Sequence, residues 1–173
     1  NGAGYDIARS LGHGYVETTP ALAPMLLNGS LHAALPGVSH RAALTLSIGS
    51  EARVRLEGSL LWTHFGISGP VALNFSRHWH SARRDGVPVR TTLSVCPGDT
   101  FESLEQWLRE QESARPRALL ATVLASKLPG ALADAWVADL GLDGQTMAHL
   151  SREDRRRMIR ALLEAPLEVR DRS

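Results

Sequence analysis

The amino-acid sequence predicts an α+β protein in which a mainly β part, residues 1–98, precedes a helical part, residues 99–165. Before Asp99, apolar residues alternate with polar ones, which is the period of a half-buried strand. After Asp99 they recur every three or four residues, which is the period of an amphipathic helix. The composition, with 43% hydrophobic and 21% charged residues in a chain of 173, is that of a globular protein with a sizeable core. A returning strand is expected over residues 166–173.

The first expected element is a helix over residues 3–11, which ends at Gly12. The stretch "TTPALAPMLL" follows and places Pro20 and Pro24 on either side of a short apolar run. Because proline donates no hydrogen bond to a neighbouring strand, this run is expected to be extended and at the edge of a sheet.

A β-hairpin is predicted next, from residues 44–48 and 51–57. Both stretches show period-two alternation, and a Gly-Ser pair lies between them, so one face of the hairpin is apolar and the other polar. A third strand is expected over residues 59–64, "SLLWTH", and a fourth over residues 87–95, "VPVRTTLSV".

A glycine turn leads from the third strand into a helix predicted over residues 70–80. Pro70 suits the first helical position, and Gly69 suits the N-cap before it. Apolar residues four apart predict the buried face of this helix, which consists of Val71, Phe75 and Trp79.

Four short helices are predicted in the helical part. The first begins at an Asp99 N-cap with Glu102 three residues later. Pro116 and Pro129 each suit the first turn of a further helix. The fourth helix begins near Ser151 and has an apolar stripe on one side.

The stretch "THFGISGP", Thr63 to Pro70, raises the question of whether Ser68 is a nucleophile. A serine between a strand and a helix, with Gly66 two residues before it, has the outline of a hydrolase nucleophile elbow. Pro70 stands where such an elbow needs its second glycine. Two other interpretations stay open: the helix start and the nearby hydroxyls bind an anion or a carbonyl oxygen, or the turn is a plain strand-to-helix corner.

Histidines give no metal site. His78 and His80 lie two residues apart on a predicted helix, where side chains point about 200° apart, so they are not expected to share a metal ion. His64 lies between a strand end and the glycine turn, where a side chain can face a cleft. It is therefore a candidate polar contact.

The charge and cysteine content exclude several classes of protein. A net charge of +1 argues against a nucleic-acid binder, so no nucleic-acid partner is expected. Glu153 and Asp154 are interleaved with the arginines of "REDRRRMIR" at helical spacing, which indicates a solvated face or a docking face. Cys96 has no partner for a disulfide and fits a reducing compartment, so a cytoplasmic location is expected. No apolar run approaches the ~20 residues that a membrane span needs.

Three stretches together, "GYDIARSLGHGYVETTPALAPM", "LEGSLLWTHFGISGPVALNFSR" and "LLEAPLEVR", resemble the central part of the YhiN/BaiN-like family of FAD-dependent oxidoreductases. The resemblance implies an inserted middle domain with a β-barrel-like, antiparallel or mixed sheet and a helical part. It also implies that the FAD-binding segments lie on either side, in a longer parent protein that binds FAD and uses NAD(P)H as a possible reductant. By this resemblance the chain alone is inactive and holds no cofactor, and its partners are the flanking FAD-binding domain and a small-molecule substrate.

The same resemblance implies that the glycine turn faces the flavin cleft. The residues it would place there are Thr63, His64, Gly66, Ser68 and Gly69. The domain would cap the flavin on the substrate side, with His64 or Ser68 supplying a polar contact. Two alternatives are a serine hydrolase-like domain that uses Ser68 and an interaction module that binds a partner through its last, arginine-bearing helix.

Overall fold

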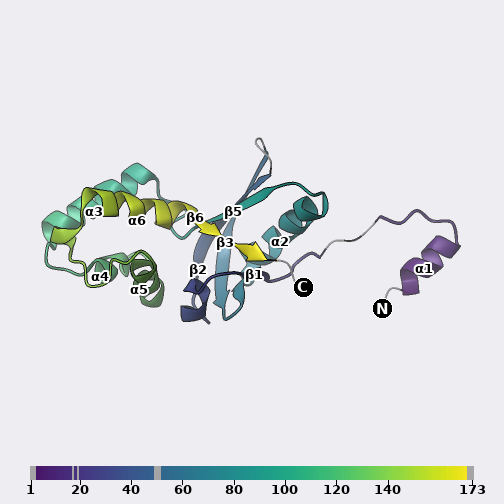
Figure 1. Ribbon diagram of the computed structural model, residues 1–173, viewed down its shortest axis with the longest axis horizontal. Helices are drawn as coiled ribbons and strands as arrows, with labels where there is room; N and C mark the ends of the chain where they lie inside the picture. Colours follow the sequence, from purple (N-terminus) through teal and green to yellow (C-terminus); the bar gives the residue numbers. More distant parts are fainter. Residues whose placement is uncertain (1–2, 17, 19, 49–51, 171–173) are drawn as a thin grey trace.

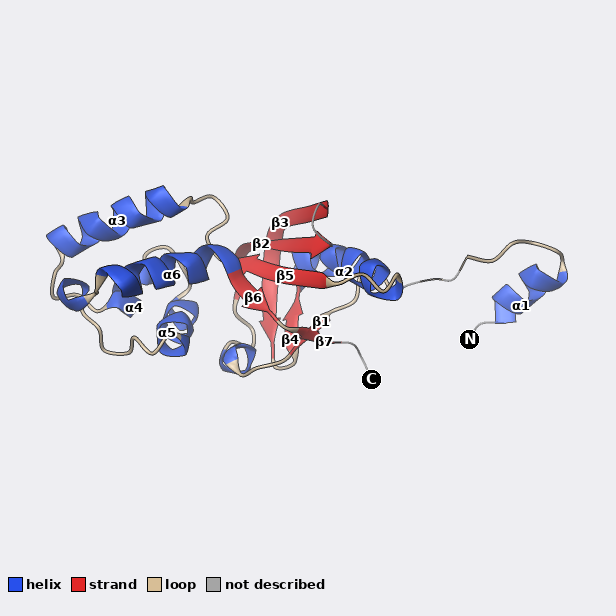
Figure 2. Ribbon diagram, turned by 45° about the horizontal axis from the view of Figure 1, so that its top comes forward, coloured by secondary structure: helices blue, strands red, loops and turns tan. Residues whose placement is uncertain are grey.

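The computed structural model describes residues 3–16, 18, 20–48 and 52–170. Seven strands form one sheet in the order β6-β5-β2-β3-β4-β1-β7, and all neighbouring strands in it are antiparallel (Figure 2). The strands are β1 Met25–Leu27, β2 Ser39–Ile48, β3 Ala52–Thr63, β4 Gly66–Ser68, β5 Val89–Ser94, β6 Ala165–Leu167 and β7 Val169–Arg170. The predicted α+β class is confirmed.

The two edges of the sheet are joined by consecutive residues. β6 pairs with β5 at one edge, and β7 pairs with β1 at the other, yet Glu168 alone separates β6 from β7 in the chain. The sheet must therefore curl until its edges come close together, which gives the barrel-like form that the resemblance implied. The expected returning strand is thus two short strands, while residues 171–173 lie outside the described part.

β3 is longer than the sequence suggested. Residues 44–48 pair with residues 52–56 as a hairpin, as predicted, and the tip of the hairpin lies outside the described residues. The expected third strand is not separate: Ala52–Thr63 is one continuous strand, and Gly58 pairs with Ala42 in its middle. Gly58 does not interrupt the ladder. Its missing side chain leaves room for α2, since an added Cβ would lie 3.5 Å from Cβ of Val71.

Helix α2, Gly69–Arg84, covers β2 and β3 with its apolar face. The predicted stripe of Val71, Phe75 and Trp79 is buried there. The helix begins one residue earlier and ends four residues later than expected. Its N-cap is Ser68 rather than Gly69, because residues 66–68 are already paired as β4 and Ser68 keeps an extended backbone.

The helical part consists of α3 Phe101–Ala114, α4 Leu120–Leu124, α5 Gly130–Asp139 and α6 Arg152–Glu164. The structure also contains two 3₁₀ turns, η1 Leu31–Ala34 and η2 Met147–His149. The core is continuous: the rings of Trp62 in β3 and Trp136 in α5 meet edge to face, with 6.1 Å between centroids. The division into subdomains therefore stays a prediction.

Two predicted helix starts were wrong. Thr100, not Asp99, caps α3, because the Thr100 hydroxyl accepts from the Ser103 backbone N–H and the Ser103 hydroxyl accepts from the Thr100 N–H. The helix expected at Pro116 begins only at Leu120. Leu119 instead forms an isolated antiparallel bridge with Thr146, which keeps the backbone extended there.

Helix α1, Ala3–Ser10, lies apart from the other elements in both ribbon views (Figures 1 and 2). None of its residues is buried. Tyr5, Ile7 and Leu11 on and just after it are exposed apolar side chains. The predicted helix is confirmed, with Gly12 in a left-handed backbone conformation after it.

Candidate functional site

The predicted glycine turn is a tight hairpin between β3 and β4. Thr63 pairs with Gly66, and His64 and Phe65 form the turn between them. The Thr63 hydroxyl donates to the Gly66 carbonyl at 3.1 Å, so Thr63 braces the hairpin. His64 is exposed, and its ring meets the edge of Phe65.

The two glycines of the turn are explained by backbone packing. Gly66 has φ +148° and Gly69 has φ +86°. A Cβ on Gly66 would lie 2.2 Å from the Met25 carbonyl oxygen, and a Cβ on Gly69 would lie 2.9 Å from the Leu61 backbone nitrogen. Both positions therefore require glycine so that β1 and β3 can approach β4 and α2.

The structure separates His64 from Ser68. Three residues of extended strand lead from the turn to Ser68, and a strand of that length spans about 10 Å. Leu27 donates its N–H to the Phe65 carbonyl at 3.0 Å, whereas Met25 pairs with Ile67, so Ser68 lies at the other end of β1. No hydrogen bond to the Ser68 hydroxyl is found within the described part of the chain. A hydrolase needs a base within about 3 Å of its serine, so the hydrolase alternative is not favoured.

A slot lies beside β1, β7 and the second half of α2, and we call it the β1–β7 slot. It has a volume of about 270 Å³ and is lined by Pro20, Ala23, Pro24, Met25, Leu26, Trp79, His80, Val169 and Arg170. The Ala23 N–H donates to the Ser76 hydroxyl of α2 at 3.1 Å, which ties the "PALAP" run to that helix. Most of the lining is apolar, with His80 and Arg170 as polar groups, which is typical of small-molecule sites.

Sequence reasoning missed the β1–β7 slot as a site. The signal available was the "PALAP" run, which had been assigned only an edge position. The slot needs β7 beside β1 and residues 20–24 across α2, and these contacts join segments far apart in the chain.

A second cleft, of about 400 Å³, lies where the sheet meets the helical part. Its polar side chains are already paired: Arg41 with Glu57 at 2.8 Å, and Lys127 with Asp99 at 3.1 Å. Burial, assisted by Asp99, raises the pKa of the Cys96 thiol to about 11, although Lys127 acts in the opposite direction. A protonated thiol between closed ion pairs is suited to structure rather than to nucleophilic chemistry.

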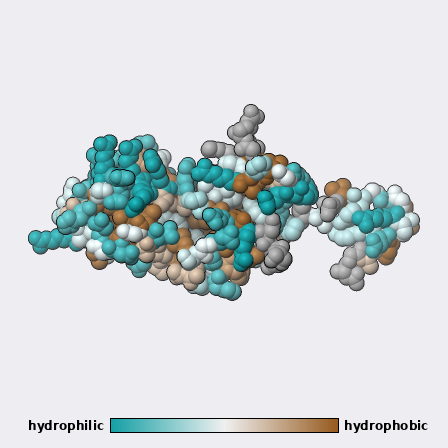
Figure 3. All heavy atoms as spheres, viewed as in Figure 1, coloured by the Kyte–Doolittle hydropathy of each residue, from teal (hydrophilic) through white to brown (hydrophobic). Residues whose placement is uncertain are grey.

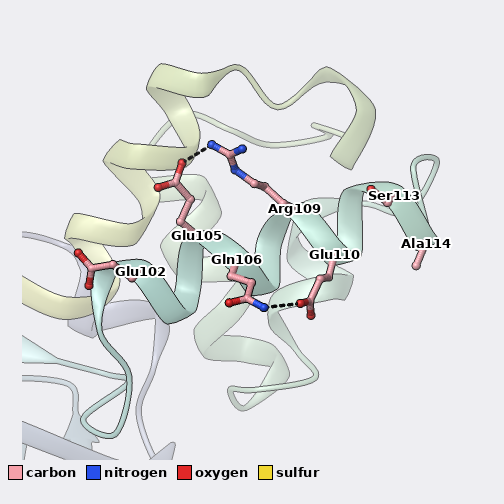
Figure 4. A pocket seen from close by; sticks show the side chains of 7 residues that line it. All are labelled: Glu102, Glu105, Gln106, Arg109, Glu110, Ser113 and Ala114. Carbon is pink, nitrogen blue, oxygen red and sulfur yellow. Dashed lines mark hydrogen bonds and ion pairs between the residues drawn. The ribbon is translucent and has the colours of Figure 1, made fainter.

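A hollow of about 720 Å³ lies on the outer face of α3 and does not form a site (Figure 4). All of its lining residues come from that one helix and point outward along it. The closest contacts are between neighbours on the helix, with Glu105 accepting from Arg109 at 2.9 Å and Glu110 accepting from Gln106 at 2.9 Å. No side chains converge there on a common point.

Metal-binding clusters and membrane-spanning helices are both absent from the part of the chain that the structure describes. Within residues 3–16, 18, 20–48 and 52–170, no group of three or more His, Cys, Asp or Glu side chains could hold a metal ion. Within the same residues, no helix combines the length and the apolar character needed to cross a bilayer.

The described residues do not form a dinucleotide site. Such a site needs a parallel βαβ unit with a glycine-rich turn at the helix start. All strand pairs in the described sheet are antiparallel, and α2 starts at a Gly-Pro pair after a three-residue strand. A slot of about 270 Å³ is also small for a whole dinucleotide. FAD therefore does not fit this domain alone.

Comparison with known proteins gives one family and several relatives. Residues 19–173 match the family model described as HI0933-like protein barrel and H2TH domain. The chain is 24% identical over 151 residues to the ribosomal RNA dihydrouridine synthase of Haemophilus influenzae, covering 86% of this chain and 34% of that protein. It is 31% identical over 134 residues to the protein of the same name from Escherichia coli, covering 76% and 30%.

A third relative has a different name. The chain is 28% identical over 97 residues to the 3-dehydro-bile acid delta(4,6)-reductase of Clostridium scindens, covering 56% of this chain and 24% of that protein. The chain thus spans about a third or less of the length of these relatives. The family match covers the sheet and the helices α2 to α6, whereas α1 lies before it. The chain belongs to the HI0933-like, YhiN/BaiN-like family of FAD-dependent oxidoreductases, and residues 19–173 are its barrel and H2TH domain.

Proposed function

We propose that this domain is the inserted, substrate-side part of an FAD-dependent reductase that saturates a carbon–carbon double bond conjugated with a carbonyl group. The observation that carries the proposal is that the names of the relatives describe the same kind of reaction. Dihydrouridine has two more hydrogens than uridine, across one ring double bond, and a delta(4,6)-reductase saturates a conjugated double bond of a steroid. Two electrons and two protons enter the acceptor in each case. FAD, with NAD(P)H as its reductant, would supply the electrons from outside this domain.

Uridine in ribosomal RNA is the substrate that we favour. The two relatives named for ribosomal RNA match 86% and 76% of this chain, whereas the bile-acid reductase matches 56%. The sequence-based expectation of no nucleic-acid partner rested on net charge, which averages over the whole surface. An RNA substrate also agrees with the proposed cytoplasmic location.

The β1–β7 slot is the proposed substrate side of the domain. β1 pairs antiparallel with β7, so the start of β1 and the end of β7 lie at the same end of this strand pair. The rest of a longer polypeptide would adjoin that end, beside the slot. Its volume of about 270 Å³ suits a single ring, and Arg170 and His80 offer polar contacts to ring carbonyls.

Ser68, rather than His64, is the proposed polar contact from the glycine turn. Ser68 and Gly69 lie beyond the Met25–Ile67 pair, next to the start of α2, and Met25 lines the slot, while Thr63 and His64 lie at the far end of the hairpin. The Ser68 hydroxyl makes no cap hydrogen bond in the described structure, so it is available to a ligand. Gly66, between these two ends, has a packing role.

The test uses the full-length protein with NAD(P)H and unmodified ribosomal RNA transcripts, and mass spectrometry of the digested RNA reports dihydrouridine. Ser68→Ala and Arg170→Gln are expected to raise KM about tenfold each, which corresponds to one lost polar contact. Arg84→Gln, at the exposed end of α2, is the matched control. The flavin absorption spectrum checks that each variant is folded.

The outcomes separate the parts of the proposal. A loss with His64→Ala instead of Ser68→Ala would move the contact to the hairpin tip. Reduction of a small conjugated enone, with no dihydrouridine in any RNA, would retain the reaction class and reject RNA as the substrate. A full-length protein that binds no flavin would overturn the function.

A further inference from the structure

Helix α6 carries a row of arginines on its exposed face. Arg152, Arg156 and Arg160 are each four residues apart, so they lie on one side of the helix, with a rise of about 6 Å between neighbours. All three are exposed, while Met158, Ile159 and Leu162 on the other side are buried in the core. We call Arg152, Arg156 and Arg160 the α6 arginine row.

The arginines of the α6 arginine row make fewer side-chain interactions than the arginines next to them on the helix. Arg155 donates to Glu112 at 2.7 Å, and Arg157 pairs with Asp154 at 3.1 Å. Within the described residues, by contrast, Arg152 and Arg160 make no hydrogen bond or ion pair. Arg156 lies over the Phe101 ring, 5.8 Å from its centre. The same helix therefore holds two kinds of arginine: Arg155 and Arg157 have acidic partners, whereas Arg152 and Arg160 have none within the described residues.

The arginine row borders a hollow of about 620 Å³ whose lining is mostly cationic. Glu153 is the acidic group in that lining, against four arginines. Of the nearby acids, Asp154 already pairs with Arg157, and Glu105 of α3 already accepts from Arg109. Hydrophilic side chains cover much of the helical end of the molecule in Figure 3. The local charge is thus positive although the chain as a whole is near neutral.

We propose that the α6 arginine row is a docking surface for the phosphate backbone of an RNA strand. The inference rests on the proposed function, in that the acceptor is a uridine within RNA. Charge complementarity supports the proposal, because guanidinium groups bind phosphates through paired N–H donors. A row of arginines on one helix face can contact successive phosphates of one strand. Phosphate contacts of this kind position a nucleic acid without reading its sequence.

The row and the slot belong to one continuous segment. α6 runs directly into β6, and β6 is followed by β7, which contributes Val169 and Arg170 to the slot (Figure 1). The path from Arg156 to Arg170 is at most about 30 Å along this segment. An RNA strand held by the row would therefore reach the slot within several nucleotides. A free nucleoside would lack these contacts.

The test measures RNA binding by the full-length protein, independent of turnover. The probe is a fluorescein-labelled poly(U) oligonucleotide, and fluorescence anisotropy gives its Kd over a range of salt concentrations. The variant is Arg152→Gln/Arg156→Gln/Arg160→Gln, since glutamine keeps the helix propensity of arginine. The matched control, Arg77→Gln/Arg84→Gln/Arg115→Gln, makes the same charge change at exposed sites elsewhere. The flavin spectrum verifies folding.

The row variant is expected to bind poly(U) at least about tenfold more weakly, and its slope of log Kd against log salt should fall by about 2, from three lost contacts at ~0.7 each. The control should keep the wild-type slope. Equal losses in both variants, or no loss in the row variant, would overturn the docking surface. If binding depends on the row but no dihydrouridine forms, the surface stands and the proposed reaction fails.

Discussion

The indole N–H of Trp62 donates a hydrogen bond to Nε2 of His40, with 3.0 Å between the two nitrogens. Because Nε2 accepts, Nδ1 carries the proton and donates to the Arg41 backbone carbonyl at 2.9 Å. The imidazole is therefore neutral, and both of its nitrogens are used. Trp62 also meets Trp136 of α5, so this hydrogen bond lies where the sheet joins the helical part.

Lowering the pH is expected to destabilise the domain through His40. Burial lowers the pKa of His40 below its ordinary value of 6.5, and the hydrogen bond to the Arg41 carbonyl only partly opposes this. The unfolded chain then binds the proton more readily than the folded one. The stabilisation is complete above pH 6.5 and is lost as the pH falls from there towards the lower folded-state pKa.

The measurement is the free energy of unfolding in urea between about pH 7.5 and about pH 5.5. His40→Gln keeps an acceptor for Trp62 but does not titrate, so its curve should be flatter than that of the wild type. The pKa of His78 is also lowered, by partial burial and by Arg77. His78→Gln is therefore the control, because it removes this second titrating histidine and leaves His40 in place. A His40→Gln curve parallel to the wild type would contradict the assignment.

Alanine at Gly66 is expected to destabilise the domain by about 3 kcal/mol. The new Cβ would meet the Met25 carbonyl oxygen at 2.2 Å, so β1 would have to move away from β4. Gly69→Ala should cost about 1–3 kcal/mol, because its φ of +86° is also unfavourable for alanine. Gly98→Ala is the control, because nothing lies within 4 Å of that position, and it should stay within about 0.5 kcal/mol. Thermal and urea unfolding would measure all three, and equal effects would refute this account of the turn.

Removing the charge of Glu112 is expected to weaken the contact between α3 and α6. Arg155 has a side chain that is 11% exposed, and its Nε has no partner in the described structure, so it depends on the 2.7 Å bond to Glu112. Glu112→Gln should cost about 1–3 kcal/mol of unfolding free energy. Asp85→Asn, which removes an exposed pair with Arg84, should change it by less than about 0.5 kcal/mol. Chemical denaturation with both variants tests the comparison.

Cys96 is expected to react slowly with iodoacetamide in the folded protein. With a pKa of about 11 in place of 9.0, it carries about 100-fold less thiolate at the same pH. Asp99→Asn should speed alkylation, because the carboxylate helps to raise the pKa of the thiol, and Lys127→Gln should slow it. Mass spectrometry after timed labelling gives the rates, with urea-unfolded protein as the fully reactive reference. Rapid labelling of the folded wild type would show that the thiol is not held neutral.

The glycine turn was visible in the sequence, but the β1–β7 slot and the arrangement around the turn were not. The "THFGISGP" stretch was singled out correctly as a turn between a strand and a helix, since glycine and proline mark such turns locally. The sequence did not show that residues 66–68 form a strand, because three residues are too few for a periodic signal. Nor did it show that His64 and Ser68 lie at opposite ends of that strand.

Local chemistry also explains which helix ends were predicted and which were missed. Ser151 caps α6 as expected, since its hydroxyl accepts from the Asp154 N–H at 3.0 Å. At α3, Asp99 and Thr100 are adjacent and both can cap. Lys127, distant in the chain, holds the Asp99 carboxylate, while Thr100 takes the cap position.

The sequence by itself determined the strands of the hairpin, the apolar faces of α2, α3 and α6, and the change from β to α near residue 99, because alternation and helical periodicity are properties of neighbouring residues. The tertiary structure alone decided the closure of the sheet and the formation of the β1–β7 slot. β6 and β7 are separated only by Glu168 and pair with strands at opposite edges. Pairing of this kind depends on long-range contacts that bury a common core, and no local pattern in three- or two-residue strands can specify it.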